Sequence, residues 1–123
     1  MPDSLVTVAI PTLAADARLL ECISALEKQT QRDFEVMIVD NSGRGLARAS
    51  GAGRAGVRVI EQPRNVGFGA AVNEAFRQSR SPYLATLNDD AVAHPGWLAA
   101  LVSAMDARPE CRLEAVAIRL KCN

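Results

Sequence analysis

Four short segments with β-strand character, each followed directly by a polar turn, constrain the fold of this 123-residue chain more than any other feature. Each is rich in apolar and β-branched residues, as strands of a parallel sheet are. The segments are residues 5–10, 34–39, 57–61 and 83–87. Because helical segments alternate with them, the sequence predicts βαβ units in a doubly wound, mainly parallel α/β sheet with strand order 3-2-1-4.

The connecting segments show the spacing of apolar residues that helices need. Leu19, Ile23 and Leu26 share one face of a helix predicted within residues 14–29. Further helices are predicted around residues 46–50, over residues 67–79 and from Pro95 to the Arg108-Pro109 pair, and a possible fifth strand over residues 114–120. No low-complexity linker interrupts the chain, so we expect one domain over residues 1–123.

Composition excludes several classes of protein. Lys plus Arg and Asp plus Glu number 14 each, so no net basic charge favours nucleic-acid binding. Three cysteines without metal-type spacing indicate a reducing compartment, and Cys22 is predicted to be a buried apolar residue. No signal peptide and no apolar run of about 20 residues is present. We therefore expect a cytoplasmic protein, with peripheral attachment to the inner face of the membrane as a further possibility for the full-length protein.

Polar residues stand at all four strand exits. In doubly wound sheets, ligands bind outside the carboxyl ends of the strands. The exits are Pro11-Thr12, Asp40-Asn41-Ser42, Arg64-Asn65 and Asn88-Asp89-Asp90. Paired acids repel one another, and a divalent cation carrying phosphates is one way to compensate them, because hard oxygen ligands suit Mg²⁺ or Mn²⁺. The alternative is that Asp89 and Asp90 only precede or cap the next helix.

Several runs, taken in order, resemble one known family. Residues 8–12 (VAIPT), 22–39 (CISALEKQTQRDFEVMIV) and 95–98 (PGWL) are similar to segments of the GT-A-fold inverting glycosyltransferases of family two. Residues 65–69 (NVGFG) with Asn73 resemble its rhamnosyltransferase-like members, and Asn88-Asp89-Asp90 stands where the family has its Asp-x-Asp-type motif. The resemblance covers most of the chain and corresponds to the Rossmann-like, N-terminal nucleotide-binding half.

This resemblance implies an enzyme that transfers a sugar from a UDP- or dTDP-linked donor to the hydroxyl of a saccharide or lipid-linked acceptor. It also implies a role in cell-wall polysaccharide synthesis. Pro11 and Thr12 would line the nucleotide pocket. Asp40, with Asn41, would accept a hydrogen bond from the imide N–H of the base.

The same resemblance assigns the phosphate side of the site. Asn65, with Arg64, would hold the nucleotide or its diphosphate. Asp89 would contact the ribose or the sugar. Asn88 would also bind the nucleotide. Asp90 would bind Mn²⁺ or Mg²⁺, which offsets charge on the leaving diphosphate. Asn88 replaces the first acid of the family motif, which removes one charge and leaves two.

The catalytic domain of the family extends beyond the length of this chain, and its acceptor-binding half carries the general base. We therefore expect a donor-binding piece that performs no sugar transfer alone, with its catalytic base unknown. We also expect self-association through the C-terminal region, because an uncovered sheet edge and its apolar face favour pairing.

Parts of the sequence are compatible with three other classes of protein. Gly67-Phe68-Gly69 partly resembles a dinucleotide fingerprint, but the turn before it is too long, and close packing of helix on sheet explains both glycines better. A receiver-like signalling domain would need an acceptor aspartate after the third strand, where Glu61 stands instead. A non-catalytic binding or interaction module that keeps the fold stays open.

Three further features have ordinary structural interpretations. His94, close to the acids, is predicted to cap the following helix and not to bind metal. Trp97 is predicted to be a core anchor. Four arginines are interpreted as a solvated face and not as a phosphate-binding patch: Arg44, Arg48, Arg54 and Arg58.

Overall fold

The computed structural model of the chain describes residues 4–54 and 56–107. Its four strands are parallel and hydrogen-bonded in the order β3-β2-β1-β4, which confirms the predicted fold class and strand order. The strands are β1 (Val6–Thr12), β2 (Phe34–Asp40), β3 (Val57–Glu61) and β4 (Tyr83–Thr86). The helices are α1 (Ala17–Leu26), α2 (Leu46–Ala49), α3 (Phe68–Gln78) and α4 (Trp97–Asp106).

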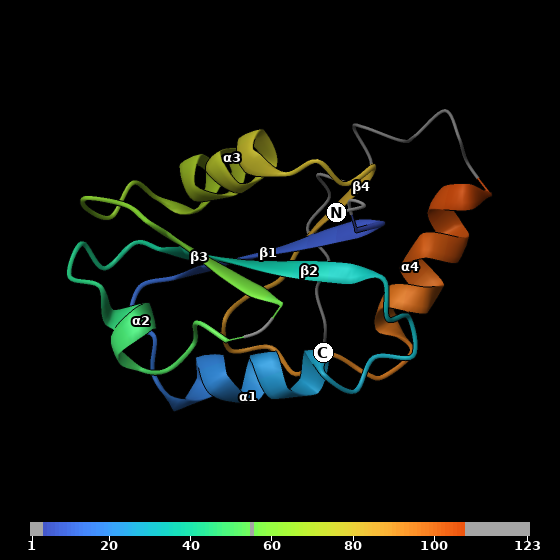
Figure 1. The fold of residues 1–123 in the computed structure, drawn as a ribbon, viewed down its shortest axis with the longest axis horizontal. Coiled ribbons are helices and arrows are strands. Elements are labelled where there is room, and N and C mark those ends of the chain that lie inside the picture. The colour runs from blue at the N-terminus through green and yellow to red at the C-terminus, as the bar shows by residue number, and fades with distance from the viewer. Residues whose placement is uncertain (1–3, 55, 108–123) are drawn as a thin grey trace.

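The helices cover both faces of the sheet, as Figure 1 shows with α3 on one side and α1 and α2 on the other. Alternate residues of β1 and β2 therefore enter two different cores. Val8 and Ile38 pack with α1 and α4, whereas Ala9 and Met37 pack with Ala71 and Ala75 of α3. Burial on both faces explains why the central strands have no solvent-facing row of polar residues.

Residues 11 and 12 extend β1 and do not form the turn that the sequence predicted. The ladder between β1 and β4 ends at Ala9 and Thr86, whereas the ladder between β1 and β2 continues to Thr12 and Asp40. Pro11 thus lies where β1 has only one neighbour, so its missing N–H removes no ladder hydrogen bond on the β4 side. The extension carries Thr12 to the rim of the sheet.

Helix positions agree with the prediction, with shorter bounds. Asp16 caps α1 by accepting a hydrogen bond from the Arg18 N–H (3.0 Å), so the helix begins at Ala17. The helix after the acids begins at Trp97 and not at Pro95, which lies before the N-cap residue Gly96. The predicted end at residues 108–109 and the predicted strand over residues 114–120 lie outside the described residues.

Candidate nucleotide-binding site

An open depression of about 240 Å³ lies at the carboxyl ends of β1, β2 and β4. Five of the residues predicted from the sequence line it: Pro11, Thr12, Asn41, Asn65 and Asp89. The other four predicted site residues are not part of its lining: Asp40, Arg64, Asn88 and Asp90. The fold thus brings together side chains from positions 11 to 89 of the chain.

A larger groove, about 460 Å³, lies between α1 and residues 92–95. Its walls are mainly apolar, with Leu20, Ala25 and Val92 among them. It does not lie at the strand exits, where an open α/β sheet binds its ligands. We therefore take the smaller depression, which we call the exit pocket, as the candidate site, because convergent polar groups mark a ligand site better than volume does.

Asn41 supplies the most informative group in the exit pocket. Its side chain is 5% exposed, and its Nδ2 donates to the carbonyl oxygen of Gly67 (3.3 Å). That bond fixes the amide orientation, because a carbonyl oxygen must face a donor. Asn41 Oδ1 is buried and has no hydrogen-bond partner within the described part of the chain. A buried acceptor without a donor is costly, so this atom is suited to a ligand N–H.

Asp40, one residue earlier, is engaged by the protein backbone. Its carboxylate is 1% exposed, Oδ1 accepts from the Ser42 N–H (2.8 Å) and Oδ2 accepts from the Ala47 N–H (2.9 Å). Gly45, the N-cap residue of α2, makes no side-chain cap, so Asp40 caps that helix from the end of β2. Burial acts to raise the pKa of Asp40, but hydrogen bonds from Ser42 and Ala47 outweigh it and hold the pKa below its ordinary value.

The Thr12 hydroxyl connects β1 with the acids after β4. It donates to Asp89 Oδ2 (2.7 Å) and accepts from the Ala15 N–H (3.1 Å). Ala15 has a φ of 50°, a left-handed conformation that residues other than glycine adopt rarely and at a cost. Such conformations concentrate where a site requires a particular backbone path. Here the path follows Leu13, which lines the exit pocket.

The paired acids differ in their surroundings. Asp89 is half-buried beside Thr12, whereas Asn88 and Asp90 are exposed. Arg18 lies within electrostatic range: its pKa is raised chiefly by the hydrogen bond and charge of Asp16, with smaller contributions from Asp90 and Asp89. The acids thus have a nearby cation but keep oxygen atoms that a metal ion can approach.

Within residues 4–54 and 56–107, no group of three or more His, Cys, Asp or Glu side chains is placed to hold a metal ion. Asp89 and Asp90 offer two carboxylates, which fits the way Mg²⁺ binds next to phosphates, with the remaining oxygens supplied by the ligand and water. The donor set therefore suits a cation that arrives with a diphosphate.

The loop between β3 and α3 forms a polar wall of the exit pocket. Asn65 Oδ1 accepts from the Gly67 N–H (2.9 Å), which makes a tight turn, while Arg64 is exposed. Gly67 has a φ of 88°, and a Cβ added at Gly67 or Gly69 would meet nothing within 4 Å. The interpretation of these glycines as close helix-to-sheet packing is therefore wrong. Gly67 is required for its backbone conformation.

Gly43 joins the turn after β2 to this loop, and its replacement should be costly. A Cβ at Gly43 would lie 2.8 Å from the carbonyl oxygen of Pro63, at a φ of 71°. Gly51 is the matched control, since its φ is 87° and nothing lies within 4 Å of its Cβ. We expect Gly43→Ala to lower the free energy of unfolding by about 2 kcal/mol more than Gly51→Ala, measured by urea unfolding. Equal losses would show that the contact with Pro63 is unimportant.

Two residues of the exit pocket were not predicted from the sequence. Leu13 and Phe68 are 55% and 40% exposed, although both are large and apolar. Leu13 lies directly after β1. The spacing of apolar residues predicted Phe68 on the same face of α3 as Val72 and Ala75, which are buried, but Phe68 opens the helix and stays exposed. An apolar residue beside a polar strand exit is the signal that could have identified them, because apolar and aromatic side chains line most ligand sites.

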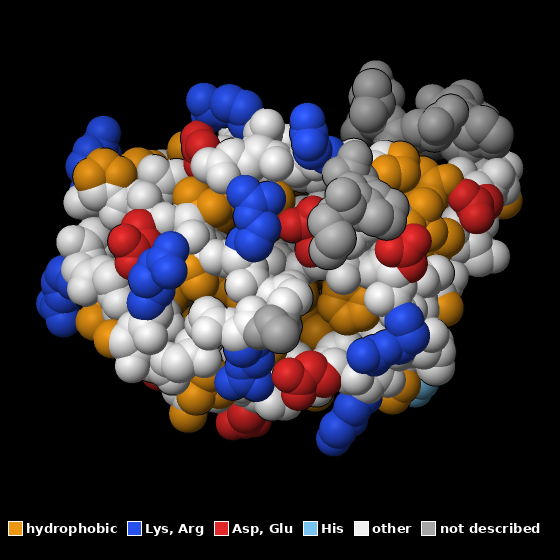
Figure 2. Space-filling view, in the orientation of Figure 1, with side chains coloured by type: hydrophobic (Ala, Val, Ile, Leu, Met, Phe, Trp, Pro, Cys, Tyr) orange, Lys and Arg blue, Asp and Glu red, His pale blue; other side chains and the backbone are white. Residues whose placement is uncertain are grey.

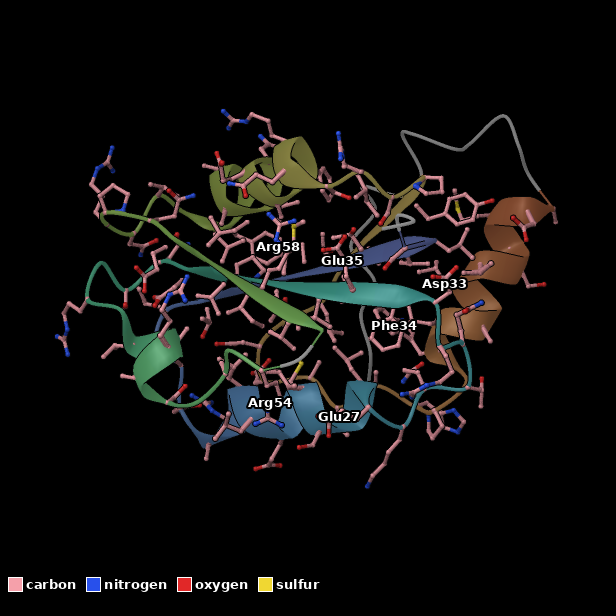
Figure 3. All side chains as sticks on the ribbon, viewed as in Figure 1. Glu27, Asp33, Phe34, Glu35, Arg54 and Arg58 are labelled. Atoms are coloured by element: carbon pink, nitrogen blue, oxygen red, sulfur yellow. The ribbon has the colours of Figure 1, made fainter. Side chains whose placement is uncertain are left out.

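Two of the three ordinary interpretations agree with the structure, and the helix-capping role of His94 does not. His94 Nδ1 accepts from the N–H of Gly96 (3.1 Å), the N-cap residue itself, and not from an N–H in the first turn of α4. Trp97 packs against the core. Basic and acidic side chains are interspersed on the face in Figure 2, and Figure 3 shows Arg54 near Glu27 and Arg58 near Glu35. Three of these four arginines form ion pairs: Arg48–Glu61, Arg54–Glu27 and Arg58–Glu35. They therefore belong to a solvated, charge-paired face.

The four-stranded parallel sheet with polar exits defines a Rossmann-like α/β domain. Residues 7–112 match the sequence profile of Glycosyl transferase family 2. The chain belongs to this family, which confirms the coarser resemblance drawn from the sequence.

Two curated relatives are much longer than this chain. It is 29% identical over 116 residues to the uncharacterized protein y4gI of Sinorhizobium fredii, a match that covers 89% of this chain and 13% of that protein. It is 28% identical over 99 residues to glycosyltransferase AglE of Haloferax volcanii, with coverage of 76% and 33%. The chain thus spans a third or less of the length of these relatives.

Solved structures share the fold. S. aureus TarS 1-349 in complex with UDP-GlcNAc is similar with a TM-score of 0.73 and 22% identity, over 85% of this chain and 32% of that one. The mannosyltransferase PcManGT from Pyrobaculum calidifontis, in complex with GDP-Man and Mn²⁺, is similar with a TM-score of 0.73 and 22% identity, over 85% and 33%. In the part of the chain that the structure describes, no helix combines the length and apolar character needed to cross a membrane.

Proposed function

We propose that this chain is the donor-binding part of a glycosyltransferase that transfers a sugar from a nucleoside diphosphate sugar to an acceptor hydroxyl. Asn41 lines the exit pocket and its buried Oδ1 has no hydrogen-bond partner, and this is the observation that carries the proposal. TarS with UDP-GlcNAc and the mannosyltransferase with GDP-Man and Mn²⁺ share the fold and support it. We further propose that the chain is rhamnosyltransferase-like, on the basis of residues 65–69 with Asn73. That residues 1–123 form a single domain stays a prediction.

The base end of the nucleotide would lie at Asn41. Uracil and thymine carry a ring N–H between two carbonyl groups, and that N–H would donate to Asn41 Oδ1. Asp40 has both oxygens engaged by backbone N–H groups, so we propose that it supports the turn and that Asn41 contacts the base. Leu13 and Phe68, at the rim, would cover the faces of the base or ribose.

The diphosphate end would lie at the acids after β4. Asp90, with Asp89, would hold Mn²⁺ or Mg²⁺ together with the diphosphate, and the cation would offset charge on the leaving group. The Thr12 hydroxyl orients Asp89 through their hydrogen bond. Arg64 and Asn65 would approach the nucleotide from the β3 side.

Discrimination between UDP and CDP tests the base contact. CDP differs from UDP at the base edge, where its ring nitrogen accepts and cannot donate. We expect the wild-type chain to bind UDP about tenfold more tightly than CDP in calorimetric titration, because the ring nitrogen of cytosine cannot donate to Asn41 Oδ1. Asn41→Leu should remove the preference. dTDP should bind like UDP, and GDP, whose base also carries a ring N–H, tests how far the pocket tolerates a purine.

Equal affinity of the wild type for UDP and CDP would contradict the assignment of Asn41. A second candidate, a non-catalytic binding module that keeps the fold, is favoured if no nucleoside diphosphate binds with or without Mn²⁺. The family membership does not by itself separate these two functions.

A further inference from the structure

We propose that Gln29, in the turn after α1, is a positioning residue that holds the segment carrying Asp89 and Asp90. This inference rests on the proposed function, because it concerns the metal side of the same site. We call residues 88–98 the acidic segment. It runs from the end of β4 to the first turn of α4 and contains both acids.

Both ends of the Gln29 side-chain amide form hydrogen bonds with this segment. Gln29 is 2% exposed, its Nε2 donates to the His94 carbonyl oxygen (2.8 Å), and its Oε1 accepts from the Leu98 N–H (3.0 Å). The next residue adds a backbone bond from the Thr30 N–H to the Pro95 carbonyl oxygen (2.9 Å). A buried amide with both ends satisfied by one distant segment fixes that segment strongly, because losing it would leave a donor and an acceptor unpaired.

α1 also contacts the beginning of the acidic segment. The thiol of Cys22, which is fully buried, donates weakly to the Asn88 carbonyl oxygen (3.6 Å), and the same oxygen accepts from the Ala91 N–H (3.1 Å). The helix and its following turn therefore hold the segment at both ends. Asp89 and Asp90 lie between these two attachments.

The two acids depend on these attachments to different degrees. Asp89 is held additionally by the Thr12 hydroxyl (2.7 Å), whereas the exposed Asp90 is placed by the path of its backbone. Binding sites need their groups held within about 0.5 Å of the productive geometry. Loss of the Gln29 contacts should therefore weaken binding that needs Asp90. Binding through Asn41 should persist, because Asn41 follows β2 and its amide contacts Gly67.

The test compares Gln29→Met with Thr7→Val. Methionine fills a similar volume without hydrogen bonds. Thr7 is the matched control, because it is also fully buried and its hydroxyl bonds Ser79 and Ser81 (2.7 Å each), near the amino end of β1 and away from the site. UDP affinity is measured by calorimetry with and without Mn²⁺. We expect Gln29→Met to reduce the enhancement of UDP binding by Mn²⁺ about tenfold and to leave metal-free binding unchanged. Thr7→Val should change neither.

Amide hydrogen exchange provides a readout that needs no ligand. Gln29→Met should speed exchange at Ala91 and Leu98, whereas Thr7→Val should not. If Gln29→Met does not fold, Cys22→Ala is the second variant. It is milder, because the Asn88 carbonyl oxygen keeps its hydrogen bond from the Ala91 N–H, and we expect a smaller loss of the Mn²⁺ enhancement of UDP binding. Unchanged exchange at Ala91, or equal binding losses in Gln29→Met and Thr7→Val, overturns the inference. Equal UDP binding by the wild type with and without Mn²⁺ overturns instead the proposed metal role, and exchange at Ala91 still decides whether Gln29 holds the segment.

Discussion

Replacement of Asp90 by asparagine is expected to remove the increase in UDP affinity that the proposed function predicts for Mn²⁺, a loss of about tenfold or more, while the thermal unfolding midpoint stays close to that of the wild type. The carboxylate offsets the charge of the cation, and the cation offsets the charge of the diphosphate, so each ligand raises the affinity for the other. Because Asp90 is exposed, its replacement leaves no buried group unpaired. Calorimetric titration of UDP with and without Mn²⁺ measures the effect.

Asp33→Asn is the matched control for this change. Asp33 is also exposed, but it directly precedes β2, at the amino end of that strand. The exit pocket lies at the opposite, carboxyl ends of the strands, and Figure 3 labels Asp33. Asp33→Asn should not alter UDP binding with or without Mn²⁺. Should Asp90→Asn bind UDP with Mn²⁺ as the wild type does, the assignment of the metal to Asp90 is wrong.

Asp40→Ala should reduce both stability and nucleotide binding. Removal of the carboxylate leaves the N–H groups of Ser42 and Ala47 without their acceptor, so the free energy of unfolding should fall by about 3 kcal/mol. Nucleotide binding should weaken with or without Mn²⁺, because the turn that carries Asn41 loses its support. Urea unfolding and UDP titration measure the two effects.

The stabilisation by Asp40 should depend on pH with a definite sign. Its pKa in the folded chain lies below the ordinary value of 3.8, so the ionised form stabilises the fold above that value. The stabilisation is lost as pH falls through the folded pKa, so the difference between wild type and Asp40→Ala should shrink in acid. Asp16→Ala is the control, because Asp16 also caps a helix but is exposed, and a smaller loss is expected. Equal losses in the two variants would refute the role of burial at Asp40.

The sheet could be predicted because short segments with β-strand character alternate with helical ones, and crossover rules leave few arrangements for such a chain. The strand exits then follow, and with them Thr12, Asn41 and Asp89. The end of β1 could not be predicted in this way. Whether Pro11 breaks a strand depends on how far the neighbouring ladder reaches, and β4 ends its pairing with β1 at Ala9.

Individual roles in the site were less predictable than its location. Asp40 and Asn41 are adjacent polar residues, and only their packing shows that one caps α2 while the other keeps a free acceptor. The left-handed backbone of Ala15 has no signature in the sequence, because alanine rarely adopts it. Gln29 looks like an ordinary residue at a helix end, since its partners lie more than 60 positions away.

Because β1 lies between β2 and β4, the sheet fixes the distance between the two ends of the candidate site. Asn41 and Asp89 follow the two strands on either side of β1, so two strand spacings, about 9.5 Å, separate the ends of those strands. Backbone hydrogen bonds between the strands set this length. In the proposed site, Asn41 and Asp89 lie in the turns just beyond these ends, so the sheet sets the spacing from which the two turns start. A shift of β1 by one residue relative to its neighbours, by contrast, would move each of its side chains to the opposite face of the sheet and destroy the site.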